Sequence, residues 1–514
     1  MKKNKTIVVL MLIAGLSKLV GFSREIILSY FWGATNISDA YLISTTIPTT
    51  IFTFVGVGIT TGFIPIYTEI KEKEGRLQSN AFVNKLLVST LLICCGLIAV
   101  GELFCGPLVR IFASGFDQET YRIAVTFTRV SLFEIGFTTI MYIMTAYLQS
   151  EDSFIAPALA SFPMNLMTIG AIWLSSNGNY YFLCIGCLAA SFAQAAFLVP
   201  FAFRKGFRIT RIANPRGDSK IKELFALALP TIIGTSVNDI NVLVDRTLAS
   251  NLSVGGISAL NYASKINAFL QGIIVLSIVS YIYPKIAKFA VNQDSGKLKN
   301  VIDSALVSIV FILLPASCVL IIFAEKIVSL IFGHGAFDRD AVLMTSSVLA
   351  FYSIGMIANG LREVFSRVLF AYKDSKTPMI NGAIGMVINI VLNLVLSSFM
   401  GIDGLALSTS VSSFCILVML MYGIARKKIW KPGRTLYVSL AKIAALSAVM
   451  CCCVLLGKRA ASMLIGNEYV SIALSVLLGG IVYLLGAFLL DIREITSMLR
   501  FTKKDREEEE APHE

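Results

Sequence analysis

Apolar stretches of roughly 20 or more residues recur along the whole chain, and short polar segments separate them. A helix of that length crosses about 30 Å of hydrocarbon. The pattern therefore predicts an all-α polytopic membrane protein with about 14 transmembrane helices. The fourteen predicted spans are residues 6–31, 40–68, 84–112, 122–148, 154–175, 180–203, 222–249, 256–284, 300–324, 341–371, 378–399, 402–425, 435–457 and 467–490.

The pattern repeats along the chain at an offset of 221 residues. Tyr41 aligns with Tyr262, and Pro157 aligns with Pro378. Because each repeat holds an even number of spans, both should enter the membrane in the same orientation, as parallel repeats do. We therefore predict two pseudosymmetric six-helix lobes and two additional C-terminal helices. The predicted divisions are an N-terminal lobe at 1–203, a basic cytoplasmic linker at 204–221, a C-terminal lobe at 222–425, two extra helices within 426–490, and a cytoplasmic tail at 491–514.

Lysine and arginine are distributed by membrane side. About thirty of the 44 lie in the segments that share a side with the N-terminus, and only about five lie on the opposite side. Basic residues are enriched on the cytoplasmic side of membrane proteins. We therefore expect both termini in the cytoplasm and the linker, with Gly217, on the same side; Gly335 should face outward.

Composition supports a membrane protein, with 56% hydrophobic and only 15% charged residues. The net charge of +12 does not indicate nucleic-acid binding, because the basic residues follow membrane side rather than one face. All ten cysteines lie in apolar spans, where thiols pack as small hydrophobic groups. With two histidines and no outer loop longer than 16 residues, we expect no enzyme activity.

Charged residues inside spans mark functional sites, because each costs roughly 2.5 to 3.5 kcal/mol at the bilayer centre. Lys18 and Glu25 share a stripe of the first span with Arg24 beside it, Asp39 opens the second, and Lys265 lies in the eighth. A central cavity lined by the three cations suits an anionic substrate, since arginine grips phosphate oxygens with two bonds. The alternative is an ion network that only fixes packing.

The second predicted span contains helix-breaking residues, including Pro48, Gly56, Gly58 and Gly62. Such breaks are tolerated in a membrane where the freed backbone lines a cavity or meets neighbouring helices. We predict a hinge there, with a static kink as the alternative. For Arg246, near the end of the seventh span, snorkelling to the interface is a sufficient explanation.

Four segments resemble the MviN/MurJ lipid II flippases, within the multidrug/oligosaccharidyl-lipid/polysaccharide exporter superfamily, and the resemblance covers nearly the whole chain. They are SKLVGFSRE at 17–25, DRTLAS at 245–250, ISALNYA at 257–263 and AYKDSKTP at 371–378. The resemblance implies that Lys18, Arg24, Glu25, Asp39 and Lys265 lie in the cavity for the lipid-linked headgroup. It also implies that the two C-terminal helices form a groove for the polyprenyl tail.

The chain departs from the family in three respects. Many members carry arginine where Lys18 and Lys265 stand, and they often carry an arginine pair just after the proline that corresponds to Pro48. The family also suggests a sodium site, for which Asp245, Asn389, Asn393 and Thr409 could supply oxygen ligands; Asn393 is neutral where members can be acidic. Hydrogen bonding between the helices by the asparagines is the alternative.

These observations predict a flippase that moves lipid II, the undecaprenyl-diphosphate-linked peptidoglycan precursor, from the inner to the outer leaflet by alternating access. We expect a monomer in the bacterial plasma membrane, with lipid II or a related polyprenyl-diphosphate lipid and membrane lipids as its partners. No cofactor is expected except a possible sodium ion. The alternatives are an exporter of another polyprenyl-diphosphate-linked oligosaccharide and a cation-coupled drug exporter of the same superfamily.

Overall fold

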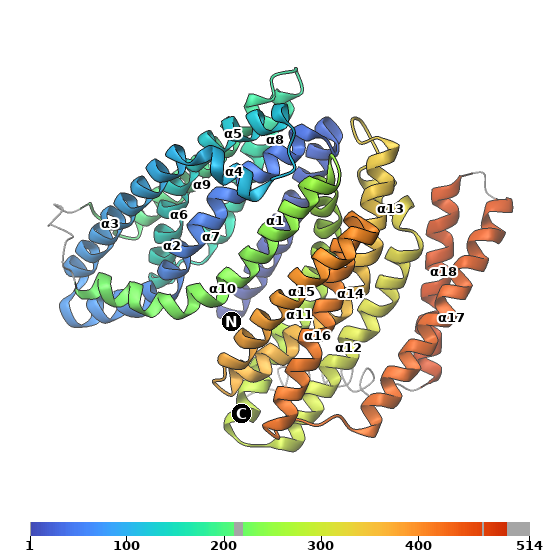
Figure 1. Ribbon diagram of the computed structural model, residues 1–514. Helices are drawn as coiled ribbons and strands as arrows, with labels where there is room; N and C mark the ends of the chain where they lie inside the picture. Colours follow the sequence, from blue (N-terminus) through green and yellow to red (C-terminus); the bar gives the residue numbers. More distant parts are fainter. Residues whose placement is uncertain (1, 210–218, 465–466, 491–514) are drawn as a thin grey trace. The chain divides into compact units, whose positions relative to one another are not determined.

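The computed structural model describes residues 2–209, 219–464 and 467–490. Within these ranges the regular structure is all α-helical, as the apolar pattern predicted, and it consists of eighteen helices (Figure 1). The helices are α1 (Lys2–Trp32), α2 (Asn36–Glu74), α3 (Arg76–Leu103), α4 (Cys105–Phe112), α5 (Gln118–Leu132), α6 (Glu134–Ser150), α7 (Ile155–Leu159), α8 (Ser161–Ser175), α9 (Tyr181–Arg204), α10 (Ser219–Leu252), α11 (Gly256–Val291), α12 (Ser295–Ile322), α13 (Ala324–Ile331), α14 (Arg339–Ala371), α15 (Lys376–Met400), α16 (Ile402–Arg426), α17 (Arg434–Leu464) and α18 (Glu468–Leu489).

Every predicted span coincides with one helix or with two consecutive helices. The predicted spans 84–112, 122–148 and 154–175 each consist of two, joined at Phe104, at Phe133 and at Ala160. In the described part of the chain, eleven helical segments are long and apolar enough to cross a membrane, or twelve if the bent helix α2 is counted. The two other predicted spans are α1 and α10, so the architecture is consistent with fourteen.

The chain forms two compact units, which are described separately. The first contains residues 1–262 and 331–344, and the second contains residues 263–330 and 345–514. The boundary between these two units falls inside α11, after Tyr262. The predicted lobes at 1–203 and 222–425 stay a prediction. Residues 210–218, in the predicted linker, and the predicted tail at 491–514 lie outside the described residues.

Helix boundaries repeat at the offset found in the sequence. Helix α9 begins at Tyr181 and α16 begins at Ile402, which is 221 residues later. The short helix that follows a long apolar one also recurs, as α4 after α3 and as α13 after α12. Apolar and turn-forming residues at equivalent positions thus produce equivalent helices in both halves of the sequence.

Polar side chains fix several helix starts by binding the backbone N–H groups that have no partner in the first turn. Asp117 accepts from Glu119 N at the start of α5, and Asn467 accepts from Tyr469 N at the start of α18. Helices α17 and α18 then pack side by side as the C-terminal pair (Figure 1).

A tight loop packs against the end of α1 in the first unit. Ala336 N donates to Tyr30 O at 2.8 Å. Gly335 has a φ of +66°, and a Cβ atom there would overlap the Tyr30 carbonyl oxygen. This position therefore excludes any larger residue, both for its backbone conformation and for lack of space.

Candidate functional site

The first predicted cluster, on α1, contains a buried ion pair. Arg24 Nη2 lies 2.6 Å from Glu25 Oε1, with 25% of the Arg24 side chain exposed and 5% of the Glu25 side chain. Arg24 Nη1 also donates to Asn165 Oδ1 on α8 at 3.3 Å, and Asn261 Nδ2 on α11 donates to Glu25 Oε2 at 3.1 Å. Side chains from three helices thus hold the ion pair, and a quarter of the Arg24 side chain stays accessible.

Lys18 is half-buried on the same helix. One residue earlier, Ser17 Oγ lies 2.6 Å from Ser161 Oγ, so α1 is held to α8 along this stretch. The Arg24–Glu25 pair is the contact that a purely structural ion network requires. Because the Arg24 side chain is also partly exposed, the pair is compatible with a binding role as well.

Asp39 is buried, with 2% of the residue exposed. Its Oδ1 accepts from Ser258 N at 2.8 Å and from Ser258 Oγ at 2.6 Å. Ser258 is the third residue of α11, so Asp39 caps that helix from another part of the chain. A carboxylate at a helix N-terminus is favoured by the helix dipole. The contacts of Asp39 therefore serve the fold, and its predicted role in substrate binding stays a prediction.

Arg246 on α10 turns toward the protein interior. Its Nη1 donates to Leu42 O on α2 at 2.6 Å and also to the Thr46 hydroxyl. The guanidinium of Arg246 therefore does not snorkel in this structure, because its hydrogen bonds connect α10 to α2. The contact lies just before Pro48, which removes one backbone donor from the helix.

Helix α2 bends at the predicted hinge. The segments Asn36–Thr53 and Val55–Glu74 meet at an angle of 45°. Pro48 lies on the first segment, and Gly56, Gly58 and Gly62 lie on the second. A Cβ atom on Gly62 would approach the Leu224 side chain of α10 within 2.9 Å, so this glycine permits close helix packing. The bend is present, and its movement stays a prediction.

The predicted sodium ligands are divided between the units. Asp245 belongs to the first unit, while Asn389, Asn393 and Thr409 lie close together in the second. Asn389 Nδ2 donates to Thr409 Oγ1 at 3.3 Å, and Asn393 Nδ2 donates to Asn389 Oδ1 at 3.0 Å. Asn389 thus hydrogen-bonds from α15 to α16, as the structural alternative required, whereas the bond from Asn393 to Asn389 lies within α15. Lys265 is half-buried and also belongs to the second unit.

An ion cluster lies at the ends of α2 and α6, outside the apolar spans. Glu151 Oε1 accepts from Lys71 Nζ at 2.6 Å and from Tyr67 Oη at 2.7 Å, and Arg76 lies 3.7 Å from Oε2. Burial by itself raises the pKa of the Glu151 carboxyl, but these hydrogen bonds and charges outweigh it. The pKa of Glu151 therefore lies below its ordinary value.

Sequence reasoning missed three polar residues inside spans. Asn165 and Asn261 hold the Arg24–Glu25 pair, and Glu134 lines a pocket beside α2. An acidic residue within the apolar segment 122–148 was a usable signal for Glu134, because charged residues inside spans are rare. The asparagines carried no comparable signal, because their partners are brought together only by packing.

The helices, with charged residues inside them, define a multi-pass, all-helical membrane protein. Comparison with known proteins gives its family. The family described as "Lipid II flippase MurJ" matches residues 28–474. The chain is 28% identical over 491 residues to the probable lipid II flippase MurJ of Thermotoga maritima, covering 94% of this chain and 96% of that protein. It is 26% identical over 429 residues to the lipid II flippase MurJ of Burkholderia cenocepacia, covering 81% and 83%.

The fold has solved counterparts. The chain matches a lipid II flippase MurJ in an inward closed conformation with a TM-score of 0.81 and 23% identity, over 94% of this chain and 99% of that one. An inward-facing multidrug MATE transporter matches with a TM-score of 0.70 and 13% identity, over 80% and 94%. The chain belongs to the MurJ lipid II flippase family. It is therefore a multi-pass protein of the bacterial inner membrane, in a family of transporters rather than catalysts.

Proposed function

We propose that this protein moves lipid II from the inner to the outer leaflet by alternating access. The observation that carries the proposal is family membership over residues 28–474, nearly the whole chain. The diphosphate and sugars of such a lipid cannot cross hydrocarbon without a polar path, because unsatisfied polar groups there cost several kcal/mol each. A protein cavity supplies that path.

Arg24 is the proposed diphosphate anchor. A quarter of its side chain is exposed, while Glu25 and Asn165 hold the remainder in place. A fixed guanidinium loses little side-chain entropy on binding and donates two parallel hydrogen bonds to phosphate oxygens. Lys18 and Lys265 are proposed to add mobile point charges to the same cavity. Lysine has no planar guanidinium, so we expect Arg24 to make the directional hydrogen bonds to the diphosphate.

The remaining parts have proposed roles in the same cycle. The bend of α2 is the proposed hinge, and helices α17 and α18 are proposed to guide the polyprenyl tail. Sodium at Asp245, Asn389, Asn393 and Thr409 is a proposed coupling ion, with the membrane potential on the cavity charges as the alternative. We propose further that the protein works as a monomer without nucleic acid, with both termini in the cytoplasm.

Complementation tests the proposal. The gene should restore growth to a bacterial strain depleted of its own lipid II flippase, and labelled lipid II should become accessible on the outer leaflet. Arg24→Ala should abolish both while the protein is still inserted, because it removes a charge-assisted contact with the cargo. Lys18→Arg should be tolerated, since it keeps the positive charge and adds a planar guanidinium that can donate two parallel hydrogen bonds.

Arg129→Ala is the matched control, because Arg129 is 61% exposed and pairs at 3.8 Å with Glu102 away from α1. It should transport normally. Normal lipid II exposure with Arg24→Ala would refute the anchor. Failure of the unaltered chain to complement, with normal insertion, would favour another polyprenyl-diphosphate-linked oligosaccharide or a drug as cargo. The MATE likeness supports that last alternative only at the level of the fold.

A further inference from the structure

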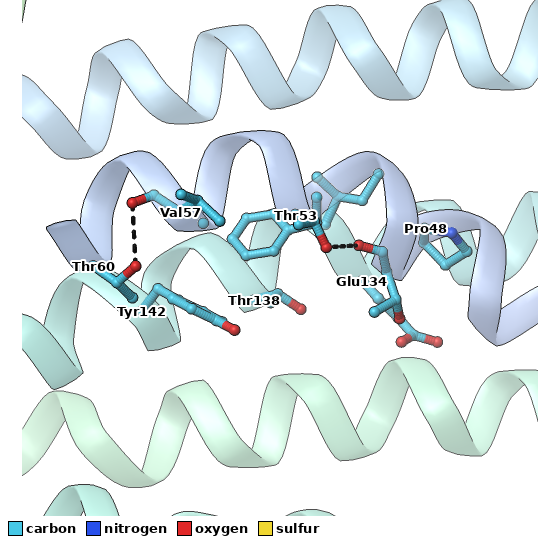
Figure 2. Close-up of a pocket in the computed structure, with 11 residues that line it drawn as sticks. Pro48, Thr53, Val57, Thr60, Glu134, Thr138 and Tyr142 are labelled. Carbon is cyan, nitrogen blue, oxygen red and sulfur yellow. Dashed lines mark hydrogen bonds between the residues drawn. The ribbon is translucent and has the colours of Figure 1, made fainter. Parts of the chain in front are cut away.

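A pocket with both polar and apolar lining residues lies beside the bend of α2 in the first unit, between α2 and α6 (Figure 2). Its volume is about 210 Å³. Figure 2 shows Thr53 and Thr60 on one wall, and Glu134, Thr138 and Tyr142 on the other. A water molecule occupies about 30 Å³ in the liquid, so the pocket has room for an ion and several waters.

The carboxylate of Glu134 is only partly satisfied. Its Oε2 accepts from Ser191 Oγ on α9 at 3.3 Å. Its Oε1 is buried and accepts no hydrogen bond of ordinary geometry from the described residues, although the Ser131 hydroxyl lies one turn earlier. A buried carboxylate oxygen without a hydrogen-bond donor is energetically costly, so a hydrogen-bond donor or a cation that binds to it is stabilised.

The hydroxyl groups on the α2 wall present oxygen rather than hydrogen to the pocket. Thr49 Oγ1 donates its proton to Thr45 O at 2.7 Å, and Thr60 Oγ1 donates to Val57 O at 3.1 Å. The one proton of Thr53 goes to Thr49 O at 3.1 Å or to the adjacent carboxylate of Asp239. The hydroxyl groups of this wall therefore act as acceptors toward the pocket, which suits a cation and disfavours an anion.

No basic side chain neutralises the pocket. Its lining residues include no lysine or arginine, and among the described residues Glu134 makes no ion pair. Nearby helices carry acidic Asp239 on α10, and Glu102 on α3 with its partner Arg129 on α5. The cation Arg246 on α10 donates to Leu42 O and to the Thr46 hydroxyl, next to the end of the pocket at Pro48, and it is not among the lining residues. An unneutralised carboxylate inside a span is costly, so the site favours an added positive charge.

We propose that this pocket binds a small monovalent cation, either sodium or a proton, with Glu134 as its charged ligand. The oxygens of Thr53 and Thr138 face the same space from α2 and α6, and the Tyr142 ring packs on Phe52 with centroids 5.1 Å apart. A cation there contacts both helices at the point where α2 bends, so its binding favours one bend angle. That coupling rests on the proposed transport function, whereas the binding does not.

Binding is measured on the full-length purified protein in detergent, without lipid II. The Asp245→Asn background removes the acidic member of the other candidate site. Equilibrium binding of radioactive sodium is compared with and without Glu134→Gln, and infrared spectra at neutral pH report a carboxyl that is still protonated there. Glu134→Gln should weaken sodium binding by about tenfold or more, or should remove the carboxyl band if the cation is a proton.

Glu102→Gln in the same background is the matched control, and it should change neither signal. Thr53→Val, which keeps the shape and removes one ligand oxygen, should weaken sodium binding by about threefold, or shift the pH at which the carboxyl band appears. Thermal unfolding of each variant verifies folding. If Glu134→Gln and Thr53→Val leave both sodium binding and the carboxyl band unchanged, the inference is overturned. That result leaves the proposed transport function intact, which fails only if the unaltered chain does not complement.

Discussion

Asp39 offers a direct test of how the fold uses a charged residue that sequence reasoning assigned to substrate. The perturbation is Asp39→Ala, which removes the acceptor for Ser258 N and Ser258 Oγ at 2.8 and 2.6 Å. A hydrogen bond to a charged group contributes about 1.5 to 3 kcal/mol, and loss of an N-cap costs about 1 kcal/mol. Relief of the cost of burying the carboxylate offsets part of this. We expect a net loss of about 2 kcal/mol in the free energy of unfolding.

Asp39→Asn separates charge from shape. The amide keeps one acceptor oxygen at the start of α11 and loses the charge that the helix dipole favours, so the expected loss is about 1 kcal/mol. Denaturant unfolding of the purified protein in detergent measures both changes. A double-mutant cycle with Ser258→Ala should show a coupling energy of about 1 kcal/mol.

Two results would count against this interpretation. If Asp39→Ala unfolds within about 0.5 kcal/mol of the unaltered protein and is additive with Ser258→Ala, Asp39 does not cap α11. If Asp39→Asn is fully stable yet fails to complement a flippase-depleted strain, the residue acts on the substrate. Partial complementation that follows stability supports the capping role.

Three further predictions concern charge, topology and coupling. Glu151→Gln should destabilise the protein at neutral pH. Because folding lowers the pKa of Glu151, its ionised form stabilises the folded protein fully above the ordinary pKa, and this stabilisation is lost as the pH falls below that value. The unfolding free energies of the variant and the unaltered protein should therefore converge at acidic pH. In a cysteine-free background, an external thiol reagent should label His334→Cys and miss Ile209→Cys, both exposed; reversed labelling would overturn the topology. Asp245→Asn should reduce the sodium dependence of lipid II translocation, and sodium-independent transport in both proteins would leave the membrane potential as the drive.

The labelling site illustrates what the structure adds to an experiment designed from sequence. Gly335 and Gly217 are the positions that the loop pattern indicates for probes. The Gly335 backbone is left-handed and a Cβ atom there would overlap the Tyr30 carbonyl oxygen, so a cysteine at this position would disturb the loop. His334 reports the same side without that strain, and Ile209 replaces Gly217, which lies outside the described residues.

The sequence by itself determined the fold class, the position of each apolar span and the family. These properties follow from local patterns, because a span requires about 20 consecutive apolar residues and the motif at 17–25 is contiguous. The charged stripe with Lys18, Arg24 and Glu25 was visible for the same reason. Its function stays a prediction. The free-energy cost of a charge inside a membrane span indicates that the charge has a role, but it does not identify what the charge binds.

Only the tertiary structure decided how polar groups far apart in the chain are paired. Asp39 meets Ser258, and Arg246 meets the carbonyl of Leu42, across about 200 residues of sequence. The sequence contains both members of each pair but not their distance. Glu134 was readable as a charge in a span, yet its open oxygen and the acceptor wall opposite depend on which rotamers and helices pack together. The pairing of buried polar groups depends on three-dimensional packing. These pairings distinguish polar residues that cap or connect helices from those that form candidate binding sites.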